Sequence, residues 1–180
     1  MDALEALLRR RSIRRYQDRP VEEDKIRKIL LAAVHSPSAG DVRCWRFIVV
    51  KDRARKEALY RAALRQSQVL QAPVVVVVAA DLEAIGKAYG RRGVELYSIQ
   101  DTAAATENML IAATALGLGT CWIGAFIEEE VSRAVNLPPH LRPVAIVTIG
   151  YPAETPGRKV VRPEDHCFSE IYGRRYEFSQ

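Results

Sequence analysis

Apolar residues recur at helical spacing near the start of the chain. Asp2 can cap a first helix, in which Leu4, Leu7 and Leu8 share one face. The same period returns over residues 22–35. Both segments therefore predict amphipathic helices, each with one face available for packing.

Three further helices are expected in the rest of the chain. Asp52 can cap a helix that continues to residue 65, and a short helix is expected over residues 128–136. The longest covers the alanine-rich residues 95–116 and should end at Gly117, because a glycine often terminates a helix.

Four apolar runs predict β-strands, over residues 46–51, 74–78, 119–124 and 142–151. The second run is five consecutive valines, which is typical of a strand buried on both faces. Helices and strands intermix without the strict alternation of a doubly wound fold. We therefore expect one α+β domain over residues 1–180, with a sheet between helical layers.

The composition is that of a soluble globular protein rather than a disordered one. The chain has 180 residues, of which 48% are hydrophobic and 27% are charged. No signal peptide is expected, and the apolar run at residues 73–80 is too short to span a membrane. Its three cysteines are too few for a disulfide framework, which favours a reducing, cytoplasmic location.

The formal net charge is +5, and much of the excess is arginine in the first twenty residues. Arg158, Lys159 and Arg162 form a second basic group. Neither group is interleaved with stacking aromatic residues or carried on a nucleic-acid-binding motif, so we expect no nucleic-acid partner. A solvated basic surface is one alternative reading of the first group.

The side chains offer little catalytic machinery of their own. The sequence has no glycine-rich dinucleotide fingerprint and no phosphate-loop lysine motif, and its three histidines are too scattered to suggest a metal site. Cys44, beside Trp45, is more readily explained as a packing thiol than as a nucleophile. If the protein is an enzyme, a cofactor should supply the chemistry.

The arginine-rich segment could hold such a cofactor by a phosphate group. In an extended chain Arg10, Ser12 and Arg14 would project to one side, and guanidinium groups pair bidentately with phosphate oxygens. Residues 37–40 are small enough for a flat ring to approach the backbone closely. Residues 122–125 follow a predicted strand and present backbone beside apolar surface.

Four segments together resemble the nitroreductase family of FMN-dependent oxidoreductases. They are RRSIRRYQDRPV, SPSAGDVRCWRFIVV, ENMLIAATALGLG with TCWIGAF, and VAIVTIGYPAE, and they span nearly the whole chain. The resemblance implies a three-layer α-β-α sandwich with a mixed, mostly antiparallel central sheet. It also implies an intertwined homodimer with FMN at the subunit interface and the arm at residues 175–178 around the partner.

The resemblance implies a reaction as well. NADH or NADPH would reduce FMN and leave, and a nitroaromatic, a quinone or a similar acceptor would then take its place in a ping-pong cycle. One alternative is a specialised flavoprotein of the same fold, which fragments its flavin or removes a halogen reductively. Another is a flavin-binding module without turnover.

Positions are carried over from the family residue by residue. The resemblance implies contacts to the phosphate, ribityl chain and pyrimidine edge from Arg10, Arg11, Ser12 and Arg14. It implies contacts to the flavin ring from Pro37, Ser38 and Ala39, and from Trp122, Ile123, Gly124 and Ala125. One or more of Arg158, Lys159 and Arg162 would also reach the phosphate. No side chain is assigned as a general acid or base.

The chain departs from the family at Asp41, where relatives usually carry an asparagine. A carboxylate there would lie in the cofactor site and repel an anionic reduced flavin unless a cation such as Arg43 pairs with it. The chain also lacks the helical insertions that shape substrate pockets in larger members. Asp101, Glu107 and Asn108 are read as solvated or capping residues of the long helix, outside the site.

Overall fold

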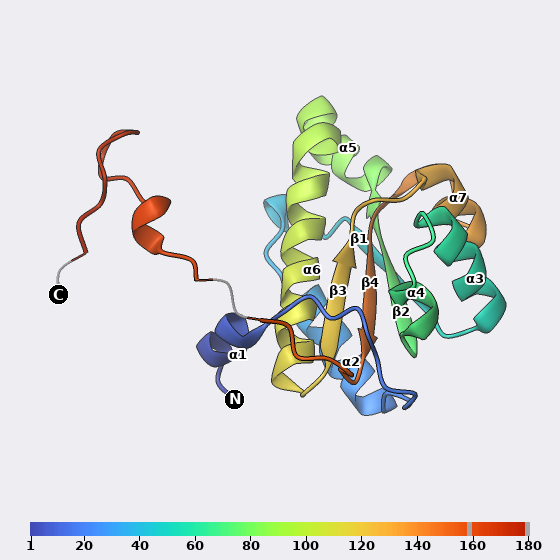
Figure 1. Cartoon of the computed structure of the whole chain (residues 1–180). Helices are drawn as coiled ribbons and strands as arrows, with labels where there is room; N and C mark the ends of the chain where they lie inside the picture. The colour runs from blue at the N-terminus through green and yellow to red at the C-terminus, as the bar shows by residue number, and fades with distance from the viewer. Residues whose placement is uncertain (158–159, 179–180) are drawn as a thin grey trace.

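The computed structural model describes residues 1–157 and 160–178 and is built around one four-stranded sheet. Its strands are β1 (Trp45–Val50), β2 (Val74–Asp81), β3 (Gly119–Ile123) and β4 (Leu141–Gly150), in the order β1-β2-β4-β3 (Figure 1). Each neighbouring pair is antiparallel. The four predicted strands are therefore confirmed, and β1 and β3 form the two edges.

Parallel pairing occurs at the β3 edge. Ser12 forms an isolated parallel bridge with Thr120, and the backbone N–H of Ile13 donates to the Thr120 carbonyl at 2.8 Å. The four strands themselves are all antiparallel, and this isolated bridge adds one parallel contact at the edge of the sheet.

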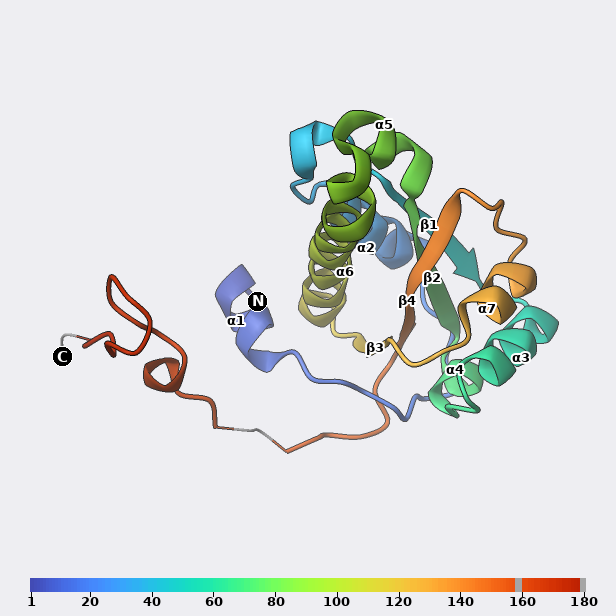
Figure 2. The same cartoon turned by 90° about the horizontal axis from the view of Figure 1, so that it is seen from above.

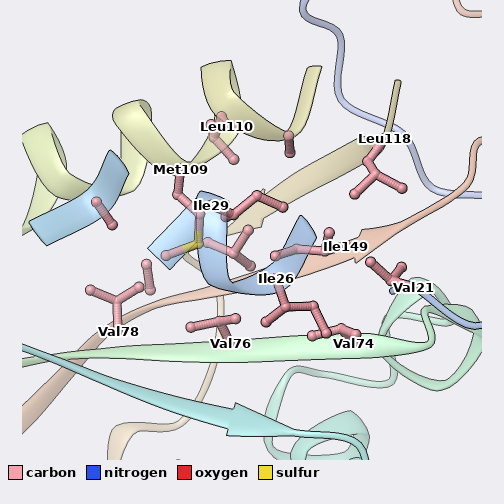
Figure 3. Packing of buried hydrophobic residues seen from close by; sticks show 14 of the residues in the cluster. Val21, Ile26, Ile29, Val74, Val76, Val78, Met109, Leu110, Leu118 and Ile149 are labelled. Carbon is pink, nitrogen blue, oxygen red and sulfur yellow. The ribbon is translucent and has the colours of Figure 1, made fainter. Parts of the chain in front are cut away.

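One face of the sheet is covered by α2 (Glu23–Val34) and α6 (Ser98–Ala115). Val74, Val76 and Val78 point from β2 toward these two helices (Figure 3). The helices contribute a second set of buried apolar side chains to this cluster, namely Ile26, Ile29, Ala33, Met109, Leu110 and Ala113.

The other face is covered by α3 (Arg53–Ala62), α4 (Gln68–Gln71) and α7 (Glu128–Ala134). Val75 and Val77 point from β2 to this side, since successive residues of a strand alternate between faces. The run of valines thus joins both cores, and the predicted three-layer α-β-α sandwich is confirmed.

The helix α1 (Ala3–Arg9) begins where expected, because the Asp2 carboxylate accepts a hydrogen bond from the Glu5 N–H at 2.8 Å. It lies against α6. Leu4, Leu7 and Leu8 remain exposed on it, so the apolar face that the sequence predicts is not covered by the described part of this chain.

Between β2 and α6 the structure contains an element that the sequence pattern does not predict. The helix α5 (Leu82–Arg92) starts at Asp81, which accepts from the Ala84 N–H at 2.9 Å. A π-helical turn, η2 (Gly93–Tyr97), then leads into α6. The long helix therefore begins as a regular α-helix at Ser98, not at residue 95, and it ends before Gly117 as expected.

The segment after β4 leaves the sandwich. Residues 160–178, which include the short helix η3 (Pro163–Asp165), lie away from the three layers in two perpendicular views (Figures 1 and 2). Several of its apolar side chains are exposed, among them Ile171 and Tyr172. None of the helices described in the structure is long and apolar enough to cross a membrane.

Candidate cofactor site

The segment that follows α1 is extended, as the proposed phosphate clamp requires. Helix α1 stops at Arg10, whose backbone turns to φ −52° and ψ 131°. The bridge between Ser12 and Thr120 then holds the segment along β3. Ile13 is buried against Gly119, where an added Cβ would lie 2.6 Å from the Ile13 side chain. Because Ile13 points inward, Ser12 and Arg14 on either side of it point outward.

These outward side chains line a cavity of about 450 Å³. Its walls are Arg10, Arg11, Ser12 and Arg14 from one segment, and Pro156, Gly157 and Val161 from the chain after β4. Three guanidinium groups and a hydroxyl around one cavity form a donor set that matches the oxygens of a phosphate group. The predicted clamp is therefore brought together by the fold. Arg158 and Lys159 lie outside the described residues, and Arg162 is exposed beside this cavity's Val161.

Two carboxylates fix the clamp in place. Glu154 accepts hydrogen bonds from the backbone N–H groups of Arg14 and Arg15, at 2.5 Å and 3.2 Å. Glu107 on α6 pairs with Arg10, with 3.3 Å between its carboxylate and Nε. Sequence reasoning missed both residues. Neither spacing nor residue type distinguishes them from ordinary surface acids.

The second predicted group, the loop with η1 (Ala39–Asp41), is held to α6 by buried and partly buried polar contacts. One oxygen of Asp101 accepts from the Ala39 N–H at 3.0 Å, and the other lies 3.6 Å from the Cys44 thiol. About two helical turns further along α6, the side-chain amide of Asn108 donates a hydrogen bond to the Ser36 hydroxyl at 2.9 Å. Asp101 and Asn108 are thus positioning residues for this loop, not solvated ones.

The loop itself holds an unusual backbone. Gly40, Asp41 and Arg43 all have positive φ, at 51°, 57° and 55°. Such a conformation is strained for the two residues with side chains. It brings the Arg43 guanidinium onto the Asp41 carboxylate in a bidentate pair, at 2.7 Å and 3.0 Å. The cation that Asp41 would need beside a reduced flavin is present.

Cys44 behaves as the packing thiol that the sequence suggests. It is completely buried, and burial, together with the nearby Asp101 carboxylate, raises its pKa to about 12. The thiol therefore stays protonated at neutral pH and cannot act as a nucleophile there.

The third predicted group lies at the end of β3. Trp122 is 39% exposed and Ile123 is buried in the core beneath α3 and α7, because the two residues point to opposite faces of the strand. Part of the Trp122 side chain is therefore accessible to a ligand. Ile123 offers only its backbone to a ligand, and an added Cβ at Gly124 would meet open space.

The clamp and the loop meet α6 on different sides. Glu107, which holds Arg10, follows Asp101, which holds Ala39, by six positions, and six positions on a helix place side chains about 120° apart. Among the described residues, the cavity at the clamp has no lining residue from the loop. One chain thus presents the two halves of the predicted site on separate surfaces.

Comparisons with known sequences agree on one protein family. The sequence model described as "Nitroreductase family" matches residues 7–71 and 54–151. The oxygen-insensitive NADPH nitroreductase of Salmonella typhimurium is 34% identical over 90% of this chain and 70% of its own. An FMN reductase (NADPH) of Bacillus subtilis is 28% identical over 94% of this chain and 73% of its own.

Comparison with solved structures also finds similar proteins. The solved structure of B. megaterium NfrA1 superimposes with a TM-score of 0.84 and is 30% identical. The match covers 94% of this chain and 74% of that one.

Proposed function

The chain belongs to the nitroreductase family of oxidoreductases, and from that premise we propose that it binds FMN and transfers electrons from NADH or NADPH to nitroaromatics, quinones or similar acceptors. The observation that carries the proposal is the cavity ringed by Arg10, Arg11, Ser12 and Arg14. A phosphate is the part of FMN that such a donor set selects.

The residues of this chain have binding and orienting roles. The clamp would hold the phosphate, while the small residues 37–39 would let the ring approach their backbone closely. The open backbone at Gly124, with Ala125 beside it, would leave room for the edge of the ring, and the partly exposed Trp122 would shield the bound ring from water. FMN, when bound, would supply the hydride-transfer chemistry between the nicotinamide donor and the acceptor.

We propose that the complete site forms between two copies of this chain. The support is that the clamp and the ring-binding loop lie on different sides of α6, so a single chain does not surround one FMN with both. A second copy can place its loop opposite the clamp of the first. The site is incomplete without it.

Exposed apolar surface supports the same assembly. Leu4 and Leu8 on α1 are 66% and 54% exposed, and Tyr172 on the segment after β4 is 90% exposed. That segment stands away from its own sandwich (Figure 2), as an arm that embraces a partner would. Covering these side chains gives a homodimer its hydrophobic driving force.

We further propose that the enzyme works in the cytoplasm. Its three cysteines are free thiols, and the nicotinamide donors are the substrates of cytoplasmic redox enzymes. This location agrees with the proposed activity.

The proposal is tested by the colour of the protein. The dimer reconstituted with FMN should be yellow, with close to one FMN per chain; anaerobic NADH or NADPH should bleach it, and a quinone should restore the colour. Bleaching without reoxidation by any acceptor would favour a flavin-binding module without turnover. Disappearance of the flavin itself on reduction would favour the flavin-fragmenting alternative. Protein that takes up no FMN contradicts all three.

The clamp is tested by charge reversal. Arg10→Glu with Arg14→Glu should abolish FMN retention and leave the far-ultraviolet circular dichroism unchanged. The matched control is Arg9→Glu with Arg15→Glu, which makes the same charge change on the same segment outside the cavity lining. Retention of FMN by the first variant, or equal loss in both, would contradict the clamp.

A further inference from the structure

A row of aromatic side chains extends from the ring-binding loop onto α5 and η2. Tyr89 touches the loop so closely that a Cβ added at Gly40 would lie 2.1 Å from its hydroxyl oxygen. The ring of Tyr97 stands edge-on to that of Tyr89, at 87° with the centroids 5.2 Å apart. Arg92 donates from Nε to the Tyr97 hydroxyl at 3.0 Å, which continues the row outward.

Irregular backbone builds this row. Gly90 interrupts α5 with φ 55° and ψ −142°, a conformation that only glycine adopts readily. Gly93 then begins the π-helical turn and packs so tightly that an added Cβ would lie 2.5 Å from the Ile85 carbonyl oxygen. Breaks of this kind concentrate at functional sites, and here they set Tyr89 and Tyr97 face to edge.

The row ends in an uncompensated positive charge. The neighbouring Arg91 is paired with Glu95 at 2.6 Å, and Arg43 of the loop is paired with Asp41. Across residues 1–157 and 160–178, no carboxylate lies within ion-pair distance of Arg92. Tyr89 is 40% exposed, so both a ring and a cation face solvent beside the loop.

We propose that Tyr89, Tyr97 and Arg92 form the acceptor-binding wall of the site, and that the wall favours planar aromatic acceptors that carry a carboxylate or sulfonate. The inference rests on the proposed function, because a flavin ring held by residues 37–39 would place its acceptor next to Gly40 and Tyr89. The tyrosine rings supply the stacking surface. Arg92 supplies a guanidinium for the acidic group.

Two acceptors that differ only in charge test the proposal: 4-nitrobenzoate and the neutral 4-nitrobenzamide. We compare kcat/KM for 4-nitrobenzoate with kcat/KM for 4-nitrobenzamide, using the FMN-loaded dimer. Arg92→Gln should lower the ratio of the first to the second by roughly five- to tenfold, because KM for 4-nitrobenzoate rises. Arg91→Gln is the matched control, since Arg91 is already neutralised, and should leave the ratio unchanged. Tyr89→Leu should raise KM for both acceptors alike.

A binding readout separates this role from a merely structural one. Arg92→Gln and Arg91→Gln should retain the FMN content and thermal midpoint of the wild type. Unreactive benzoate should perturb the flavin absorbance of oxidised wild-type dimer at lower concentration than benzamide, and this difference should vanish in Arg92→Gln.

The other outcomes distinguish a failure of the proposed function from a failure of the inference about the acceptor-binding wall. A wild type that binds no FMN would refute the proposed function itself. A wild type that turns over both acceptors, with a ratio insensitive to Arg92→Gln, would overturn the inference alone. An effect of Arg92→Gln confined to the reduction by NADPH would assign Arg92 to the donor's phosphate and would also overturn it.

Discussion

Removing the carboxylate of Asp101 should loosen the ring-binding loop and weaken FMN binding without touching the clamp. Asp101 is 5% exposed and is the acceptor of the Ala39 N–H. In Asp101→Ala that partly buried N–H loses its partner, at a cost of about 2 kcal/mol. For a chain of this length the thermal midpoint should fall by roughly 4–8 °C.

The same loss should appear in the affinity for FMN. A loop that is no longer ordered before binding must be ordered by the ligand, so the dissociation constant should rise by about tenfold, which corresponds to ~1.4 kcal/mol. Fluorescence titration of FMN into the apoprotein measures it. Asp101→Asn keeps an oxygen for Ala39 and should show less than half of either effect.

The exposed neighbour Gln100 provides the control, since Gln100→Ala changes the same helix on its solvent side. Its stability should stay within about 0.5 kcal/mol of the wild type. If Asp101→Ala matches Gln100→Ala in both midpoint and affinity, the reasoning about the loop is refuted.

Three other changes have defined outcomes. Arg43→Gln leaves the Asp41 carboxylate unpaired and should lower the two-electron potential of bound FMN by about 30 mV, measured by dye equilibration; Asp41→Asn should not lower it. A hydrogen bond from Tyr151 lowers the pKa of Glu22 from 4.5 to about 2, so its contribution to stability is complete above pH 4.5 and is lost toward pH 2. The difference in thermal midpoint between wild type and Glu22→Gln should therefore shrink over that range, and a constant difference would contradict the assignment. Leu59→Ala, at a fully buried position, should cost about 2–5 kcal/mol in urea unfolding; a loss below about 1 kcal/mol would contradict the core packing.

Much of the fold follows from local sequence signals. The five valines of β2 identify the buried central strand, and Asp2 and Asp52 cap their helices as the pattern predicts. The helix α5 is not predicted, because Gly86 and Gly90 weaken its helical signal and Ile85 is its one fully buried residue.

The candidate site shows a similar division. The alternation of Arg10, Ser12 and Arg14 is readable in the sequence, since it requires only an extended chain. The positioning roles of Asp101 and Asn108 depend on where a distant loop meets α6. Their spacing of seven residues places both side chains on the same side of the helix, and it is the one signal that could have indicated them.

The central claim, that each FMN is held by the clamp of one chain and the loop of another, is tested most directly with mixed dimers. One subunit carries Arg10→Glu with Arg14→Glu. The other carries Gly40→Val, which cannot easily adopt the positive φ of Gly40 and collides with Tyr89. Neither homodimer should retain FMN. The mixed dimer, purified by two affinity tags, should bind close to one FMN per dimer, because one intact clamp faces one intact loop; a mixed dimer that binds none would contradict the account.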